Sequence, residues 1–218
     1  MIKAVFTDFY GTLAHEDGEI VKMISQGIYD TGKADSISEI GAYWWAVFQH
    51  SFANAYGESF RTQRELEYVS LLDTIRHFDS SADAAKLSEL MFSHWQKPPV
   101  FPDTVPFFKQ CPVPVYIVSN IDRCDVVSAL AHMCVKPDGI FTSEDARSYK
   151  PRRELFLYAL EHTGLNADEV THIGDSLSSD VNGASGAGIK AVWLNRGGRE
   201  VPEGVTAVTT LIDIFPFL

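Results

Sequence analysis

The chain opens with a short apolar run that ends in a polar turn. Ile2–Phe6 is mostly apolar, and the residues that follow it include an aspartate and Gly11. An apolar run of this length, bounded by a turn, is typical of a buried β-strand. Glycine lets the backbone turn sharply where a side chain would clash. The pattern therefore predicts a strand that carries polar residues at its carboxyl end.

Residues from about 14 to 100 show helical periodicity instead. One set of aromatic residues recurs every four positions, which places it on a single face of a helix: Trp44, Phe48, Phe52 and Tyr56. We expect this aromatic stripe to pack as core between helices rather than to form a substrate box. Arg61–Phe78 and Ser81–His94 continue the helical period, and Ser80 or Ser81 is a candidate cap for the second of them. The prolines of Lys97-Pro98-Pro99 end the helical region.

From Val100 onward, β-branched runs alternate with helical stretches. The strand candidates are Val113–Val118, Gly139–Thr142, Val170–Ile173 and Lys190–Leu194. The helices between them are Asp122–Met133, Arg152–Thr163 and Ser178–Gly186. This alternation predicts an α/β fold, a doubly wound parallel sheet with helices on both faces. The sequence thus predicts a core domain of residues 1–13 and 100–218, and a helical domain of residues 14–99 inserted after the first strand.

Polar residues follow several of these strands at the same end. Asp8, Ser119 and Asp175 each come at the carboxyl end of a predicted strand, although more than 160 positions separate the first from the last. Ligands of parallel α/β sheets bind beyond the carboxyl ends of the strands. We therefore expect these three side chains to converge on one site.

Four motifs together carry a family resemblance. They are Asp8-Phe9-Tyr10-Gly11-Thr12, then Ser119-Asn120, then Lys150-Pro151, and last the segment Gly174-Asp175-Ser176-Leu177-Ser178-Ser179-Asp180. Carboxylate, hydroxyl, lysine and paired carboxylates in this order resemble the haloacid dehalogenase (HAD) superfamily of hydrolases. The resemblance covers the whole chain. It implies a Rossmann-like core, with the inserted helical domain acting as a cap.

The resemblance also implies a role for each motif residue. Asp8 would be the nucleophile that forms an aspartyl-phosphate, and Lys150 would neutralise charge and keep Asp8 ionised. Ser119 would donate a hydrogen bond to a phosphoryl oxygen, helped by the backbone amide of Asn120. Thr12 would orient the turn and the transferring group.

A cation is needed where an anionic nucleophile meets an anionic phosphate. Mg²⁺ prefers oxygen ligands. The resemblance implies ligands from Asp8, from Asp175 and from the backbone carbonyl of Tyr10. Asp180 would act through a water molecule or orient the other ligands.

The first and last motifs point to different branches of the superfamily. Most phosphatases carry a second aspartate, the general acid and base, where this chain has Tyr10, and Asp-x-Tyr-Gly-Thr is the pattern of L-2-haloacid dehalogenases. The segment Arg64-Glu65-Leu66-Glu67-Tyr68 also resembles dehalogenase caps, with Arg61 as an imperfectly aligned candidate for the anion-binding arginine. Dehalogenases have a serine where this chain has Asp175, and they use no metal. A carboxylate there suits Mg²⁺ and would repel a haloacid, so it favours a phosphatase.

Three functions therefore stay open. The one that we favour is a Mg²⁺-dependent phosphatase acting on a small phosphorylated metabolite, slowed because a tyrosine, with an ordinary pKa of ~10, is a poor base at neutral pH. The alternatives are a metal-independent 2-haloacid dehalogenase and a non-catalytic phosphate- or partner-binding protein. Substrate contacts are expected from Tyr10, Gly11, Asn120 and Arg61.

Composition narrows the classes of partner. The 218 residues carry a net charge of −11, and no basic run appears, which argues against nucleic acid and anionic membranes as partners. No signal-peptide pattern and no apolar stretch of membrane-spanning length is seen. The three cysteines have neither metal-type nor disulfide-type spacing. We expect a cytoplasmic protein with a small-molecule substrate, either a monomer or a homodimer.

Overall fold

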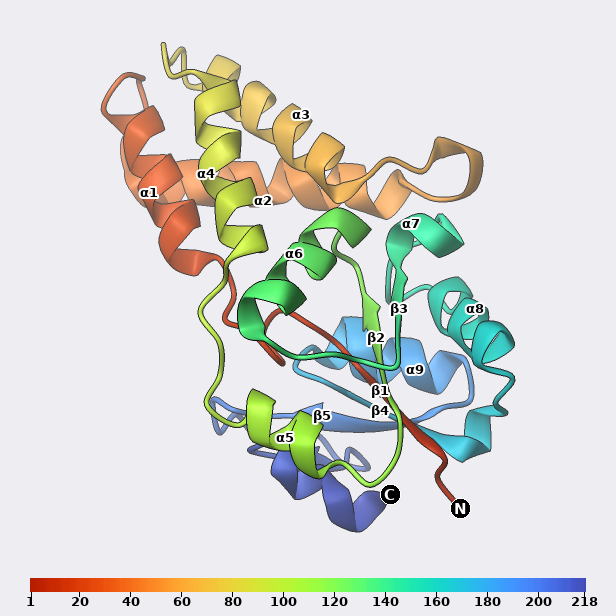
Figure 1. The fold of residues 1–218 in the computed structure, drawn as a ribbon. Helices are drawn as coiled ribbons and strands as arrows, with labels where there is room; N and C mark the ends of the chain where they lie inside the picture. The colour runs from red at the N-terminus through yellow and green to blue at the C-terminus, as the bar shows by residue number, and fades with distance from the viewer. The chain divides into compact units, whose positions relative to one another are not determined.

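The computed structural model describes all residues from 1 to 218 (Figure 1). The chain divides into two compact units, which we call the core unit and the helical unit. The core unit consists of Met1–Glu16 and Pro98–Leu218, and the helical unit of Asp17–Lys97. None of the helices combines the length and the apolar composition needed to cross a bilayer.

A six-stranded parallel sheet forms the centre of the core unit. Its strands are β1 (Ala4–Thr7), β2 (Val115–Ser119), β3 (Gly139–Thr142), β4 (Val170–Gly174), β5 (Lys190–Leu194) and β6 (Ala207–Val208). Their order across the sheet is β3-β2-β1-β4-β5-β6, with every pair parallel. The order reverses at β1, the kind of switch point at which ligands of such sheets bind. The α/β fold with a doubly wound parallel sheet is thus confirmed.

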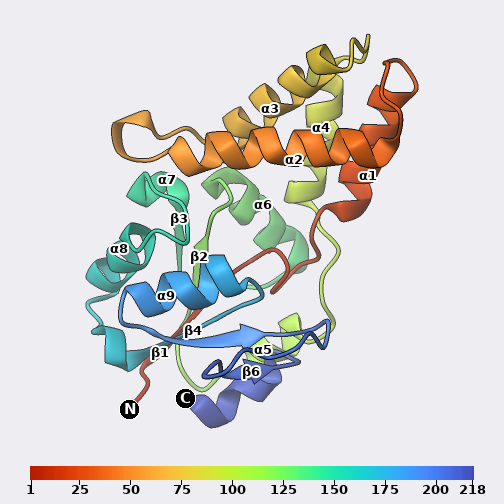
Figure 2. The ribbon, with the colours of Figure 1, turned by 180° about the vertical axis from the view of Figure 1, so that it is seen from behind.

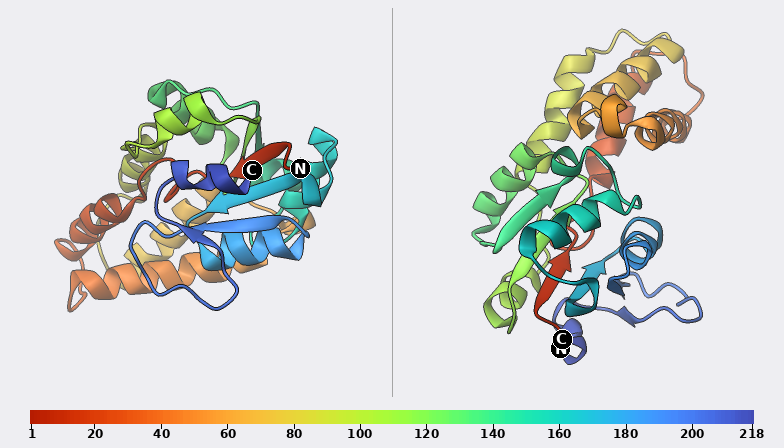
Figure 3. Two further views of the ribbon diagram at one scale, coloured as in Figure 1. Left: turned by 90° about the horizontal axis from the view of Figure 1, so that it is seen from below. Right: turned by 90° about the vertical axis from the view of Figure 1, so that its right-hand side faces the viewer.

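Helices cover both faces of this sheet. They are α5 (Thr104–Gln110), α6 (Arg123–Met133), α7 (Ser143–Ala146), α8 (Glu154–Thr163) and α9 (Gly183–Gly186), with short turns η2 (Ala167–Glu169) and η4 (Ile212–Phe217). Figures 1 and 2 show α5 and α6 on one face and α8 and α9 on the other, and Figure 3 shows the sheet between these layers. The strands are therefore largely buried on both faces, which explains why their apolar residues are not confined to alternate positions.

The main hydrophobic cluster lies between the sheet and α8 and α9. Phe6 of β1 and Val118 of β2 are fully buried in it, and so are Leu155 and Phe156 of α8. Burying a Leu or Phe side chain contributes about 1.5–3 kcal/mol. This packing holds the strand ends, and the polar residues that follow them, in a rigid frame.

The helical unit consists of four helices. They are α1 (Gly18–Tyr29), α2 (Ile37–Asn54), α3 (Gln63–His77) and α4 (Ala84–Gln96), with the short turn η1 (Gly57–Ser59) after α2. Helix α2 packs against α1 and α3, and α4 packs against the same two helices. Ser36 caps α2, Asp83 caps α4, and Thr62 with Glu65 forms a capping box on α3.

The helix boundaries differ in places from the sequence expectations. Helix α2 ends at Asn54, so Tyr56 does not continue the aromatic stripe along it. The cap of α4 is Asp83 and neither Ser80 nor Ser81, because Asp83 accepts hydrogen bonds from the backbone amides of Ala85 and Lys86. The predicted helix Ser178–Gly186 is a π-helical turn, η3 (Leu177–Asn182), followed by α9.

Candidate active site

The Asp8 carboxylate is held from both of its oxygens. Asp8 directly follows β1, and its backbone amide donates to the carbonyl of Ile173 in β4 at 3.0 Å. Lys150 Nζ donates to Oδ1 at 2.6 Å, and Thr12 Oγ1 donates to Oδ2 at 3.0 Å. The side chain is buried but retains 11% exposure, whereas Lys150 is 2% exposed. The Asp8 carboxylate is thus held in place and paired with a lysine, and its remaining exposure lets a small ligand reach it.

Lys150 bridges two carboxylates. Its Nζ also donates to Oδ1 of Asp180 at 2.6 Å. The Asn120 side chain holds the Lys150 backbone, since its Oδ1 accepts from the Lys150 amide at 2.7 Å and its Nδ2 donates to the Lys150 carbonyl at 3.2 Å. The structure therefore gives the Asn120 side chain a task that sequence reasoning did not foresee: it positions the lysine.

Three groups contact the Asp180 carboxylate and hold it in place. Besides Lys150, the backbone amide of Ser176 donates to Oδ2 at 3.0 Å, and His172 Nε2 lies 3.1 Å from Oδ1. The carboxylate packs against Gly174, where an added Cβ would lie 2.2 Å from the Asp180 carboxyl carbon. Only glycine at position 174 leaves room for this arrangement.

Asp175 completes a cluster of three carboxylates. Oxygen atoms of Asp8, Asp175 and Asp180 all lie within 4.8 Å of one another. Gly11 has a φ of +80°, and a Cβ there would lie 2.5 Å from the Asp175 carboxyl carbon, so the turn after β1 and Asp175 are in direct contact. The Asp175 carbonyl accepts hydrogen bonds from Trp193 Nε1 at 2.8 Å and from Arg199 at 3.1 Å.

Burial and the charges of neighbouring groups shift the pKa values of the three clustered carboxyl groups. Burial and the negative charges of Asp8 and Asp180 raise the pKa of Asp175 to about 8. Burial also raises the pKa of Asp8, against the opposing charge of Lys150. For Asp180, burial would raise the pKa, but Lys150 and His172 together hold it below the ordinary value.

Two of the same carboxylates raise the pKa of Lys150. Burial alone would lower the pKa of the Lys150 ammonium, but the charges of Asp180 and Asp8 outweigh this effect and raise it. Lys150 is therefore a permanent cation. One ammonium facing three carboxylates leaves a deficit of positive charge at Asp175.

This deficit matches a divalent cation with oxygen ligands. The donor set of the cluster is made of carboxylate oxygens, which suit Mg²⁺ and not a softer metal. Asp175, with its raised pKa, is the carboxylate that a bound cation would keep ionised. The residues present thus fit a magnesium ion.

Three further residues were singled out by the sequence: Ser119, Tyr10 and Arg61. Ser119 ends β2, is buried, and its Oγ accepts from the amide of Ile121 at 3.2 Å. Tyr10 is half-buried, with its ring edge-on against Phe9 at 5.0 Å between centroids. Arg61 belongs to the helical unit, where it is exposed and directly precedes the cap of α3.

Two supporting residues escaped sequence reasoning. His172 stands inside the apolar run of β4, and a polar residue at a fully buried strand position was the signal for it. Arg196 donates to the Thr12 carbonyl at 2.8 Å and pairs with Asp103, so it braces the turn after β1. Nothing in the sequence around Arg196 indicates this long-range contact.

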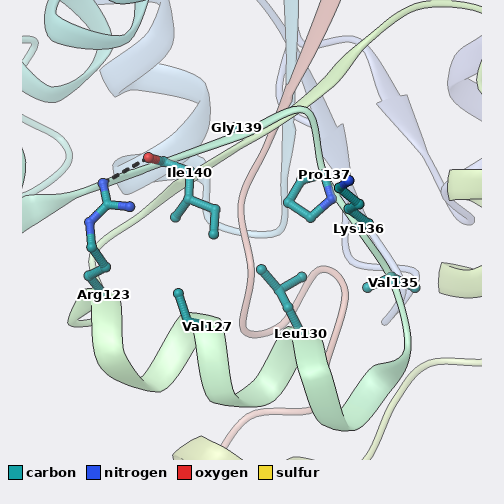
Figure 4. A pocket seen from close by; sticks show the side chains of 8 residues that line it. All are labelled: Arg123, Val127, Leu130, Val135, Lys136, Pro137, Gly139 and Ile140. Atoms are coloured by element: carbon teal, nitrogen blue, oxygen red, sulfur yellow. Dashed lines mark hydrogen bonds between the residues drawn. The ribbon is translucent and has the colours of Figure 1, made fainter.

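The core unit also has a hollow of about 310 Å³ between α6 and the segment that leads into β3 (Figure 4). Its walls are mostly apolar and include Val127, Leu130 and Ile140. Arg123 lies at one end, where its guanidinium donates to the Ile140 carbonyl at 2.9 Å. None of the three clustered carboxylates lines it, so this hollow is separate from the candidate site.

A second cavity, of about 130 Å³, lies within the helical unit. All four helices and the residue before α1 contribute to its lining. The lining residues are Asp17, Val21, Gly41, Trp44, Trp45, Phe48, Gln63, Glu67, Met91 and Trp95. Trp44 is buried, as expected for the aromatic stripe, but it lines this cavity together with the half-buried Phe48. The stripe is therefore not simply packing between helices.

Glu67 should make the stability of the helical unit depend on pH. Burial, and then the charge of Asp17, raise its pKa from 4.5 to about 8. Between these values the folded state holds a proton that the unfolded state has lost, so the free energy of unfolding falls as pH rises, by about 1.4 kcal/mol per pH unit. The contribution is fully present below the unfolded pKa and is lost as pH rises through the folded one.

We expect Glu67→Gln to remove this dependence. Urea unfolding should be followed by tryptophan fluorescence between pH 5 and 8. The free energy of unfolding of the variant should increase relative to that of the wild type as pH rises. Glu89→Gln, which removes an exposed carboxylate of α4, is the matched control. Parallel pH profiles for the Glu67→Gln variant and the wild type would contradict the assignment.

Comparison with known proteins places this geometry in a family. A family model described as haloacid dehalogenase-like hydrolase matches residues 2–188. Pyrimidine 5'-nucleotidase YjjG of Escherichia coli is 40% identical over 79 residues, which are 35% of this chain and 35% of that protein. The match thus spans about a third of the length of this relative.

Solved structures share the fold across the whole chain. The defluorinating L-2-haloacid dehalogenase Rha0230 superposes with a TM-score of 0.80 at 20% identity, covering 100% of this chain and 95% of that one. YfnB from Bacillus subtilis, bound to magnesium, superposes with a TM-score of 0.78 at 18% identity, covering 100% and 98%. At these identities the likeness concerns the fold alone.

Proposed function

Because the chain belongs to the haloacid dehalogenase-like hydrolases, we propose that it is a Mg²⁺-dependent phosphatase of a small phosphorylated metabolite. Asp8, Asp175 and the backbone carbonyl of Tyr10 would hold the ion, and Asp180 would act through water or orient the others. When bound, Mg²⁺ supplies positive charge that offsets the repulsion between the nucleophile and the phosphate. The helical unit would act as the cap that selects the substrate, with Arg61 as a candidate contact.

One observation carries this proposal. Oxygen atoms of three carboxylates lie within 4.8 Å of one another, and a single lysine is hydrogen-bonded to two of them. A haloacid carries its own carboxylate, and a metal-free site in which Lys150 already pairs with Asp8 and Asp180 has no further cation among these residues to bind it. Carboxylate oxygens are donors that Mg²⁺ prefers. Asp175, whose pKa is raised, is the carboxylate that a bound cation would keep ionised.

The residues of the chain divide the reaction into two displacements. An oxygen of Asp8 forms a bond to phosphorus while the bond from phosphorus to the leaving oxygen breaks, and that oxygen takes up a proton. The oxygen of a water molecule then forms a bond to phosphorus and loses a proton, while the bond between phosphorus and the Asp8 oxygen breaks. Inorganic phosphate leaves and the Asp8 carboxylate is restored. Lys150 and the hydroxyl of Ser119 would stabilise the charge on the phosphoryl oxygens, and Thr12 keeps the nucleophile oriented.

The second displacement is the difficult one for this chain. No second aspartate follows Asp8 at two positions, because Tyr10 stands there. A tyrosine is a weak general base at neutral pH. We therefore expect slow turnover, or a substrate with a good leaving group such as an acyl or aryl phosphate.

Tyr10 also favours a second candidate function, a metal-independent 2-haloacid dehalogenase with Asp8 as nucleophile. Assays of para-nitrophenyl phosphate and L-2-chloropropionate, each with Mg²⁺ and with EDTA, separate the two. Phosphate release that requires Mg²⁺ supports the phosphatase, whereas chloride release that resists EDTA would overturn it. If neither product forms, yet the phosphate mimic BeF₃⁻ binds, the chain is a binding protein on this scaffold.

Tyr10→Asp should restore the missing acid and base. We expect it to raise kcat for para-nitrophenyl phosphate by about 10²-fold, the usual contribution of a positioned general acid–base group. Tyr10→Phe serves as the control, because it removes the hydroxyl without adding a carboxylate. Equal or lower turnover in Tyr10→Asp, with Mg²⁺ saturating, would mean that position 10 does not limit the reaction.

A further inference from the structure

The cavity of the helical unit has a composition that calls for a ligand. Four of its lining side chains are aromatic: Trp44, Trp45, Phe48 and Trp95. Two more are carboxylates, Asp17 and Glu67, and no lysine, arginine or histidine lines it. Aromatic faces attract positive charge, and so does a carboxyl group once it is ionised, whereas the wall itself carries no cationic side chain.

Glu67 is the most telling residue of this wall. Its side chain is 6% exposed, and its Oε1 is buried without a hydrogen-bond partner. A buried polar atom left unpaired costs about 1–3 kcal/mol, so such atoms are rare unless something else satisfies them. The atom belongs to a residue that lines the cavity, so a ligand held there could supply the missing partner.

The other polar groups of the wall are oriented by the helices. Trp95 Nε1 lies 3.3 Å from Oδ2 of Asp17 and donates to it. Trp44 Nε1 donates to Ser70 Oγ at 3.1 Å, which directs the polar edge of this indole to Ser70. Both indole N–H groups are thus occupied by protein acceptors, so neither is free to donate to a ligand in the cavity.

The size and the opening of the cavity limit the ligand. Its volume of about 130 Å³ is close to that of an apolar cavity of about 150 Å³ that holds benzene. Trp45 lines the cavity, yet its side chain is 60% exposed, so the wall reaches the surface there. A compact group of a few carbon atoms fits inside, with a substituent free to extend outward.

From these contacts we propose that the helical unit binds an organic ammonium cation, held among the rings of Trp44, Trp45 and Trp95 and beside the buried side chain of Glu67. This binding does not depend on the proposed phosphatase activity. The positive charge would favour the ionised form of Glu67, which burial and the charge of Asp17 disfavour.

A pair of isosteric probes tests the proposal. Choline and 3,3-dimethylbutan-1-ol have nearly the same shape, but only choline is charged. Tryptophan fluorescence titrations at constant ionic strength should show choline binding at least about tenfold more tightly. Equal affinity for the two probes, or no saturable binding of choline, would overturn the proposal.

Glu67→Gln should weaken choline binding by about tenfold or more, whereas Glu89→Gln, on the exposed side of α4, should leave it unchanged. Equal losses in the two variants would show that general surface charge, and not the cavity, attracts the cation. Trp45→Leu gives an independent check, because it removes a ring that is 60% exposed and that stacks on Phe48 at the cavity wall. Its choline affinity should fall while the circular dichroism spectrum stays the same, and an unchanged affinity would count against the cavity.

A last comparison tests whether the bound ammonium is part of the substrate or a separate ligand. This comparison rests on the proposed phosphatase activity. Choline phosphate and 3,3-dimethylbutyl phosphate are assayed as substrates. A higher kcat/KM for the charged ester, lost in Glu67→Gln, assigns the ammonium to the substrate. Equal kcat/KM values, together with choline binding, assign it to a separate ligand. Absence of turnover with intact choline binding would refute the phosphatase and leave the cation site standing.

Discussion

Asp8→Asn is expected to lower phosphatase kcat by about 10⁴-fold or more while the fold stays intact. Removing a catalytic nucleophile costs on the order of 10⁴–10⁶ in turnover. The amide keeps an oxygen that can accept a hydrogen bond from Lys150 or Thr12, so the turn after β1 should hold its shape. Steady-state kinetics with para-nitrophenyl phosphate and saturating Mg²⁺ provide the measurement.

The same variant has a second readout that does not depend on turnover. The charge of Asp8 is one of the causes that raise the pKa of Asp175, so its removal should lower that pKa from about 8. Carboxyl ¹³C NMR of the metal-free protein can follow the titration. An unshifted Asp175 would show that the two carboxylates do not interact as the geometry indicates.

Asp168→Asn is the matched control for these measurements, because Asp168 is exposed and lies outside the cluster. It should leave both kcat and the pKa of Asp175 unchanged. Full activity of Asp8→Asn would remove Asp8 from the mechanism and, with it, the proposed phosphatase reaction.

Lys150→Met is expected to be the most destabilising change in the core unit. The ammonium is 2% exposed and is the shared partner of Asp8 and Asp180. Removing one partner of a buried ion pair costs about 3–5 kcal/mol, because the other charge stays buried and uncompensated. Urea denaturation at pH 7 in EDTA should show a loss of this size, whereas Lys109→Met, on the exposed side of α5, should show almost none.

The loss in Lys150→Met should depend on pH and on metal. Without the lysine, the buried carboxylates have folded pKa values above their unfolded ones, so they bind protons on folding. Their unfavourable contribution is absent below the unfolded pKa and grows as pH rises, which makes the variant relatively more stable in acid. Mg²⁺ binds only the folded cluster and should restore part of the stability at pH 7. A loss that neither acid nor Mg²⁺ reduces would point to lost packing instead.

The local pattern of the chain was enough to predict the sheet. Strands β3 and β5 have the bounds expected from their apolar runs, and β1, β2 and β4 differ only by a few residues at their ends. Because helices cover both faces, the strands are mostly apolar along their length, with exceptions such as His172 in β4, and this signal needs no knowledge of their neighbours. The two-residue strand β6 and the short helix α5 were missed, since neither is long enough to show a period.

The residues that follow those strands were predictable for the same reason. Asp8, Ser119 and Asp175 come at strand ends, and parallel strands place all their carboxyl ends at one edge. Local order along the chain therefore sufficed to bring Asp8 and Asp175 into one candidate site.

Contacts between distant segments were beyond the reach of the sequence. The Asn120 side chain grips the backbone of Lys150, and Arg196 braces Thr12, only because the strand order places their loops together. In the helical unit, the aromatic period of α2 predicted a packed face, yet Trp44 and Phe48 surround a cavity with the unpaired Glu67. Periodicity reports which face of an element is buried, whereas the partner that each buried group meets, or lacks, depends on how separate elements pack in three dimensions.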